Sequence, residues 1–217
     1  MTKPIIVLGG GGHAKVLIDM LGRLDCRVLG MVDPNQAIGS MVHGLKVLGA
    51  DNVVFDYPAA EVELVNGMGS LPRDKGLRAS LFNAFSAKGY RYKTLVDPTA
   101  IVAADVQLSD GVQVMAGVII QTGTEIAVNT IVNSGAIVDH DCRIGSHVHI
   151  APGAVLSGAV EVGDAVHIGT GATIIQGISI GGGSIIGAGS VITRSIACNQ
   201  IVYPVRPQIR SISRDKV

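Results

Sequence analysis

The chain has 217 residues, enough for one large or two small domains, and its 17 basic and 17 acidic side chains give a formal net charge of zero. A neutral chain produces no long-range field that gathers nucleic acid or an anionic membrane, so we expect neither as a partner. The three cysteines are odd in number and far apart, which argues against a disulfide framework and predicts a reducing, cytoplasmic location. The apolar run at 5–8 is too short for a signal sequence or a membrane span.

The first half of the chain alternates between strand and helix patterns. In chain order the sequence predicts a strand at 4–8, a glycine loop at 9–12, a helix at about 14–24, a strand at 27–32, a strand at 62–65 and a helix at 74–87. This alternation is typical of an open parallel α/β sheet of the Rossmann-like type. We therefore predict a first, α/β domain over 1–92 and a second domain over 93–217.

The glycine loop predicts a phosphate site. It joins a strand to a helix, where backbone N–H groups and the helix N-terminus can meet a phosphate. His13 stands where a dinucleotide fingerprint needs a small residue, so the motif does not favour NAD. Asp33, at the end of the second strand, is placed to contact a ribose or a base. Together they suggest a mononucleotide or nucleotide sugar; a tight structural turn with an incidental aspartate is the alternative.

The second half of the chain repeats every six residues. Leu, Val or Ile occupies each sixth position from Val96 to Ile192 without a gap. Such hexapeptide repeats are typical of a parallel β-helix, in which one aliphatic side chain per repeat points inward and three repeats make a triangular coil. We predict a left-handed parallel β-helix of five to six coils with no long inserted loop.

Four of the six histidines fall within this repeat: His140, His147, His149 and His167. None occupies an inward aliphatic position, so we expect them on outer faces or corners and not in the core. His140 stands between Asp139 and Asp141, and a carboxylate beside an imidazole can fix its tautomer and raise its basicity. This arrangement suits a general base that works near neutral pH.

The spacing of the histidines also predicts how they lie in space. His149 and His167 are eighteen residues apart and should stack on one outer face. His140 and His149 begin adjacent corners, so one subunit would hold them about a full face apart. Only a neighbouring subunit could bring a second histidine close to His140, which predicts a closed homotrimer with sites between subunits. Zinc binding, as in γ-class carbonic anhydrases, is a weaker alternative because the histidine spacings differ, and we predict no metal.

The glycine loop with His13, the Asp33-Pro34 pair and the segment from Asn133 to Gly145 together resemble the bacterial sialic-acid O-acetyltransferase and nucleotide-amino-sugar N-acetyltransferase family. That family includes the UDP-4-amino-sugar acetyltransferase of bacillosamine synthesis and GDP-perosamine N-acetyltransferase. The resemblance implies N-acetylation of a nucleotide-linked 4-amino-4,6-dideoxy sugar by acetyl-CoA, for lipopolysaccharide or another surface glycan. Two alternatives stay open: O-acetylation of a sugar such as sialic acid, and a non-catalytic scaffold that binds nucleotide sugars.

The resemblance also implies roles for individual residues. His140 would be the general base of a direct transfer, with Asp141 orienting it and Asn133 supporting the pocket. The residues expected to hold the nucleotide sugar are Gly11, Gly12, His13, Asp33, Pro34 and Gly49. The residues expected near acetyl-CoA are His149, Thr170 and Ala188. Neither Cys142 nor any serine has a base at a convincing spacing, so we expect no acyl-enzyme.

Overall fold

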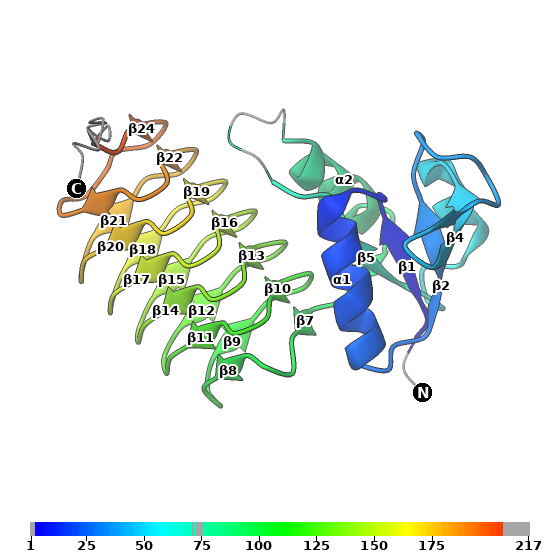
Figure 1. The fold of residues 1–217 in the computed structure, drawn as a ribbon, viewed down its shortest axis with the longest axis horizontal. Coiled ribbons are helices and arrows are strands. Elements are labelled where there is room, and N and C mark those ends of the chain that lie inside the picture. Colours follow the sequence, from blue (N-terminus) through cyan, green and yellow to red (C-terminus); the bar gives the residue numbers. More distant parts are fainter. Residues whose placement is uncertain (1–2, 71, 73–75, 206–217) are drawn as a thin grey trace, which may run out of the picture.

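The computed structural model describes residues 3–70, 72 and 76–205. It has an α/β part at the N-terminal end and a long solenoid that runs to the C-terminal end (Figure 1). Within the described residues, no helix is long and apolar enough to cross a membrane.

The α/β part is an open sheet with strand order β3-β4-β2-β1-β5-β6. Its elements are β1 (Ile5–Leu8), α1 (Gly12–Arg23), β2 (Val28–Val32), β3 (Met41–Val42), β4 (Leu45–Gly49), the 3-10 helix η1 (Asp51–Asp56), β5 (Glu63–Asn66), α2 (Leu77–Ser86) and β6 (Arg91–Tyr92). All neighbouring strands are parallel except β3 and β4. The Rossmann-like sheet is therefore confirmed, with one antiparallel edge strand added. The first two residues of the helix predicted at 74–87 lie outside the described residues.

The centre of the sheet is β1, whose four residues are all buried. A parallel strand covered on both faces has no exposed side, so it reads as a continuous apolar run and not as an alternating pattern. The hairpin of β3 and β4 was not predicted. Its turn uses His43 and Gly44, both with positive φ, and this pair lacks the Asn-Gly signature of such turns.

The solenoid confirms the six-residue repeat. Every strand from β7 to β23 is two residues long, and its second residue is one of the aliphatic positions from Val96 to Ile192. The strands are β7 (Leu95–Val96), β8 (Ile101–Val102), β9 (Gln107–Leu108), β10 (Gln113–Val114), β11 (Ile119–Ile120), β12 (Glu125–Ile126), β13 (Ile131–Val132), β14 (Ile137–Val138), β15 (Arg143–Ile144), β16 (His149–Ile150), β17 (Val155–Leu156), β18 (Glu161–Val162), β19 (His167–Ile168), β20 (Thr173–Ile174), β21 (Ser179–Ile180), β22 (Ile185–Ile186), β23 (Val191–Ile192) and β24 (Ile201–Val202).

These strands form three parallel faces of seven, six and five strands. We call the face with β7, β10, β13, β16, β19, β22 and β24 the domain face, because its strands β10 and β16 contact the α/β part. The face with β8, β11, β14, β17, β20 and β23 is the apolar face, and the face with β9, β12, β15, β18 and β21 is the polar face. Residues eighteen apart are paired in register, as His149 is with His167.

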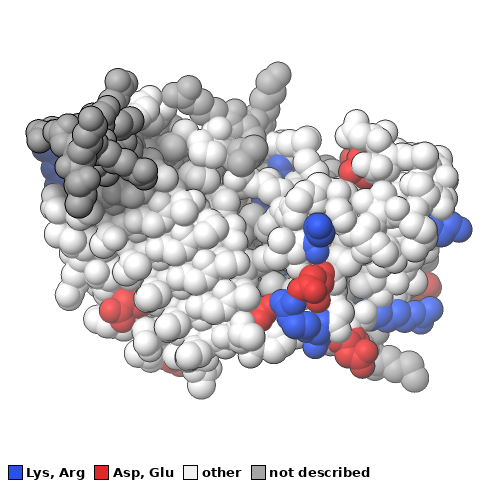
Figure 2. Space-filling view, in the orientation of Figure 1, with Lys and Arg blue, Asp and Glu red and all other residues white. Residues whose placement is uncertain are grey.

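Outward side chains distinguish the two faces that the α/β part leaves open. On the apolar face they are Ile101, Ile119, Ile137, Val155, Thr173 and Val191. On the polar face they are Gln107, Glu125, Arg143, Glu161 and Ser179. Figure 2 shows that the solenoid carries few charged side chains in that view.

Polar contacts join the α/β part to the solenoid. Arg23 of α1 pairs with Asp97, whose side chain is fully buried just after β7. Gln113 of β10 donates to the carbonyl oxygen of Asn66 at 2.9 Å. The last sheet strand ends at Tyr92 and the first solenoid strand begins at Leu95. We propose that the boundary between the α/β domain and the solenoid domain falls between residues 92 and 93.

Candidate active site

A cavity of about 740 Å³ lies where the carboxyl edge of the sheet meets the solenoid. The sheet contributes the glycine loop after β1 and the residues that follow β2, β4 and β5, and the solenoid contributes residues on and beside the domain face. Seven of the predicted site residues line this cavity: Gly11, Gly12, His13, Asp33, Pro34, Asn133 and His149. His13 and Asn133, which are 120 positions apart in the sequence, therefore line the same cavity.

Five predicted site residues lie outside the cavity: Gly49, His140, Asp141, Thr170 and Ala188. Gly49 ends β4 and is buried, and a Cβ there would lie 2.5 Å from Cγ2 of Val53. Gly49 therefore packs against η1, and its proposed role in closing the pocket stays a prediction. Thr170 and Ala188 are exposed and stack along the corner that joins the domain face to the apolar face. Ser134 lies at the same corner, and their proposed contact with acetyl-CoA stays a prediction.

Asp33 shapes the glycine loop. Its Oδ2 accepts a hydrogen bond from the backbone N–H of Gly10 at 2.8 Å, and its Oδ1 accepts one from the backbone N–H of Asn35 at 2.8 Å. The carboxylate thus ties the end of β2 to the loop that follows β1. Since each carboxylate oxygen can accept more than one hydrogen bond, Asp33 still has acceptor capacity for a ligand in the cavity.

His13 is held as a neutral imidazole. Burial, together with the positive charge of Arg78, lowers its pKa to about 4. Its Nε2 lies 2.8 Å from Oε1 of Gln113. An amide oxygen only accepts, so Nε2 carries the proton and Nδ1 keeps its lone pair. The role of Gln113 could not be predicted from the sequence, because it depends on which solenoid face the α/β part covers.

His149 is also neutral, and both of its ring nitrogens are engaged. Nδ1 donates to the carbonyl oxygen of Ser70 at 2.8 Å, and Nε2 accepts from Nδ2 of Asn133 at 3.1 Å. Burial and the neighbouring His167 lower its pKa to about 4. We expected an outer-face histidine that stacks on His167, and the rings do pair at 4.9 Å. The expectation that it is not buried was wrong, since the segment at Ser70 covers it and leaves 8% exposed.

This burial predicts a loss of stability in mild acid. The folded-state pKa of His149, about 4, lies below the ordinary value of 6.5, so the unfolded chain takes up the proton first as pH falls. The stability is therefore complete above pH 6.5 and declines toward pH 4. From the pKa difference we expect His149 alone to lower the free energy of unfolding by about 2 kcal/mol between about pH 7.5 and pH 5.

Urea denaturation at both pH values measures this loss. A His149→Gln variant, which does not titrate in this range, should show a pH dependence smaller by that amount. The remaining dependence should include the contributions of His13 and His147, because burial lowers the pKa of both in the same direction. An equal loss of stability in the variant and the original chain would contradict the assignment.

His140 and Asp141 form a pair at the corner between the apolar and polar faces. Nδ1 of His140 lies 2.8 Å from Oδ2 of Asp141, so Nδ1 carries the proton and Nε2 keeps its lone pair. Asp141 holds a left-handed backbone, with φ of 58°, which turns its carboxylate toward the ring. The hydrogen bond to Asp141, helped by the charge of Asp139, raises the pKa of His140. An exposed imidazole with a free Nε2 can accept a proton.

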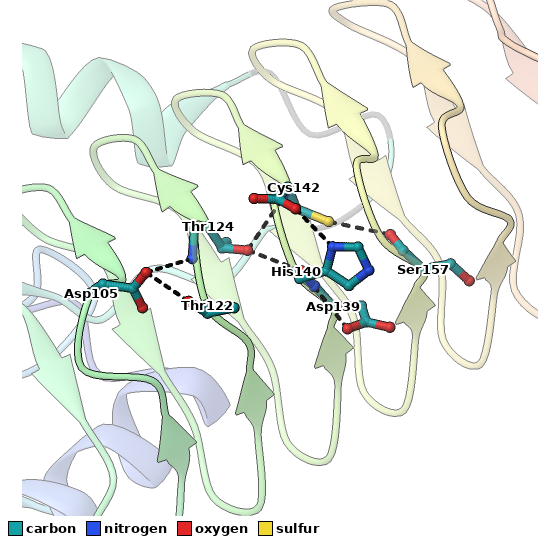
Figure 3. Close-up of polar contacts among 9 residues, drawn as sticks. Asp105, Thr122, Thr124, Asp139, His140, Cys142 and Ser157 are labelled. Carbon is teal, nitrogen blue, oxygen red and sulfur yellow. Dashed lines mark hydrogen bonds and ion pairs between the residues drawn. The ribbon is translucent and has the colours of Figure 1, made fainter.

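Cys142 lies beside this pair but is turned into the solenoid. Its thiol is buried and donates to the carbonyl oxygen of Ser157 at 3.3 Å. Burial raises the pKa of the thiol, which lowers the fraction of reactive thiolate. Figure 3 shows its sulfur directed toward Ser157, while the His140 ring lies on the outside of the coil. The geometry therefore gives Cys142 a packing role.

A second polar contact supports the coil before this pair. Oδ2 of Asp105 accepts hydrogen bonds from the hydroxyl of Thr122 at 2.7 Å and from the backbone N–H of Gly123 at 3.0 Å (Figure 3). These bonds lower the pKa of Asp105 and keep its carboxylate charged.

Among the described residues, no group of three or more His, Cys, Asp or Glu side chains is placed to hold a metal ion.

A family model of the PglD N-terminal domain matches residues 4–82. No curated protein sequence matches the chain. Among solved structures, a histidine mutant of perosamine N-acetyltransferase from Caulobacter crescentus, in complex with CoA and GDP-perosamine, is 33% identical. The match covers 98% of this chain and 99% of that chain, with a TM-score of 0.86.

Two further solved structures share the fold. The acetyltransferase domain of PglB from Neisseria gonorrhoeae FA1090, in complex with acetyl coenzyme A, is 30% identical, covers 96% of this chain and 100% of that chain, and has a TM-score of 0.85. WeeI from Acinetobacter baumannii AYE is 22% identical, covers 92% and 96%, has a TM-score of 0.78 and supports the fold alone. The predicted left-handed β-helix and the predicted family are thus confirmed. With 33% identity over 98% of its length, the chain belongs to the hexapeptide-repeat acetyltransferase family that contains perosamine N-acetyltransferase and the acetyltransferase domain of PglB.

Proposed function

We propose that this acetyltransferase moves the acetyl group of acetyl-CoA to the amino group of a nucleotide-linked 4-amino-4,6-dideoxy sugar, in the synthesis of lipopolysaccharide or another surface glycan. The observation that carries the proposal is the cavity that runs from a glycine loop to a solenoid corner. The loop offers backbone N–H groups and the N-terminus of α1 to a diphosphate. The relatives with CoA and GDP-perosamine, or with acetyl coenzyme A, support both substrates.

The strand order suggests how the nucleotide sugar lies in the cavity. Along the carboxyl edge of the sheet, the residues that follow β4, β2, β1 and β5 succeed one another, so Asp51 and Asp33 come before the glycine loop and Met68 comes after it. With the phosphates at the loop, the base points toward Asp33 and the sugar points toward the solenoid. There it would meet His149 and Asn133.

The reaction we propose is a direct transfer within a ternary complex. The sugar amine attacks the thioester carbonyl carbon while Nε2 of His140 takes the amine proton. The C–N bond forms, the C–S bond breaks, and the CoA thiolate leaves and is then protonated. Backbone N–H groups at a coil turn stabilise the negative charge on the carbonyl oxygen. Asp141 keeps the proton on Nδ1, so that Nε2 faces the reaction.

We further propose a homotrimer, because one subunit cannot complete this site. The cavity opens beside the domain face and reaches the corner with Asn133 and Ser134, which borders the apolar face. His140 lies at the other edge of the apolar face. In a ring of three subunits with their apolar faces turned toward the axis, opposite edges of neighbouring apolar faces meet. His140 of one subunit would then approach the Asn133 corner of the next, and Thr170 and Ala188 would line the groove between them.

Three free cysteines, one of them buried, fit a protein that works in the reducing cytoplasm.

The proposed homotrimer can be tested separately from the proposed reaction. Light scattering at micromolar concentration should give the mass of three chains, and a monomeric mass would remove the trimer from the proposal.

The test of the reaction is release of free thiol from acetyl-CoA. We expect rapid release with one member of a panel of UDP-, GDP- and dTDP-linked 4-amino-4,6-dideoxy sugars, and none with the matching 4-hydroxy sugars, because the amine is the nucleophile. Mass spectrometry should show one added acetyl group on the sugar. Turnover with sialic acid alone would move the assignment to O-acetylation, and no turnover with any acceptor would favour a binding scaffold.

A further inference from the structure

The surroundings of His140 contain two glycines that leave room for its pair with Asp141. Gly158 lies eighteen residues after His140, one coil further along the same corner. A Cβ at Gly158 would lie 2.5 Å from Nε2 and 2.6 Å from Cε1 of His140. On the other side, a Cβ at Gly123 would lie 2.4 Å from Oδ1 of Asp141. All three distances are far below van der Waals contact, so a side chain at either glycine and the observed pair exclude each other.

The backbone does not account for glycine at position 158. Gly123 has φ of 73°, a conformation that favours glycine by itself, whereas Gly158 lies outside the left-handed region. At the same place in neighbouring coils the chain carries Thr122 and Gln176, so this corner position accepts side chains. What distinguishes Gly158 is the imidazole that lies over it.

We infer that Gly158 is a positioning residue for the proposed acetyl transfer: by lacking a side chain, it lets the His140 ring lie across the corner with Nδ1 against Asp141 and Nε2 over Gly158. The inference rests on the proposed function, since it matters only if His140 takes the proton. A methyl group at position 158 would turn the ring out of this place. The ring is the free end of an exposed side chain, so it can turn without disturbing the coil.

The test is Gly158→Ala. A general base displaced by about 1 Å loses on the order of 10²-fold in rate, so we expect kcat to fall by about that factor, with little change in Tm. The His140 ring should also titrate at a lower pH, because it loses the hydrogen bond to Asp141 and moves away from Asp139. Proton NMR of the ring measures this shift without any assay of activity.

Two controls match this variant. Gln176→Ala places the same methyl group at the same corner one coil further on, and Gly22→Ala places it in α1, where a Cβ would have nothing within 4 Å. Neither should change kcat. Unchanged kcat and an unchanged ring titration in Gly158→Ala would overturn the inference.

A double-mutant cycle separates this inference from the proposed function. If Gly158 acts through His140, then Gly158→Ala in a His140→Ala background should cost nothing further. An additional loss in that background would show that Gly158 acts on the substrates by another route, and the inference would be wrong. If His140→Ala alone keeps full activity, the proposed base fails, whatever Gly158 does.

Discussion

His140→Ala should lower kcat by about 10²–10⁴-fold, the usual contribution of a positioned general base. The ring is exposed, so its removal leaves no cavity in the solenoid, and Tm should stay within a few degrees. The KM values should change little, because the glycine loop that we propose to hold the nucleotide phosphates has no contact with His140 of the same subunit, whose side chain pairs with Asp141. Steady-state kinetics of thiol release with the preferred amino sugar measures all three quantities.

The pH profile tests whether His140 acts as a base. Only the neutral imidazole accepts a proton, so kcat/KM should fall on the acid side through the pKa of His140. Since Asp141 raises that pKa, the fall should centre above the ordinary value of 6.5. Asp141→Asn should move it to lower pH. If His140→Ala keeps both the rate and the acid limb, His140 is not the base, and the amine reaches the thioester already deprotonated.

The solenoid could be predicted from sequence almost residue by residue, because its rule is local. One inward aliphatic per six residues is enough to specify a strand, a corner and the stacking of the next coil, and every predicted inward position from Val96 to Ile192 ends a strand. The sheet was harder to predict from the sequence. Its buried central strands were recognised by composition, whereas the hairpin of β3 and β4 depends on a turn, His43-Gly44, without a strong signature.

In the site, too, contacts between neighbouring residues were easier to predict than contacts between distant segments. The sequence placed His140 between two aspartates, and the structure shows that Asp141 contacts the ring, at 2.8 Å. The state of His149 depends on three partners from distant segments, Ser70, Asn133 and His167. No periodicity shows that the α/β part covers the face on which His149 lies. The same holds for Gln113, which reaches His13 across a hundred residues of sequence.

Ile137→Glu should convert the trimer to monomers and abolish measurable acetyl transfer. Ile137 points outward from the middle of the apolar face, and a carboxylate there would have to be desolvated in the subunit interface. The inward residue beside it, Val138, keeps the core, so the variant should stay folded by circular dichroism. Gln107→Glu adds the same charge on the polar face and should remain a fully active trimer. A trimeric, active Ile137→Glu variant would show that another surface joins the subunits.

Mixed trimers test which subunit supplies each half of the site. Gly12→Asp adds a negative charge to the phosphate loop and should block the cavity, while His140→Ala removes the base. Each variant alone should show little or no activity, since every site in its trimer lacks one component. After the two are unfolded and refolded together, random mixing should leave about a quarter of the sites with an intact loop on one subunit and an intact histidine on the next. Activity should therefore reappear on mixing, because the two defects lie on different subunits. If the loop and the histidine of one subunit served the same site, mixing would restore nothing.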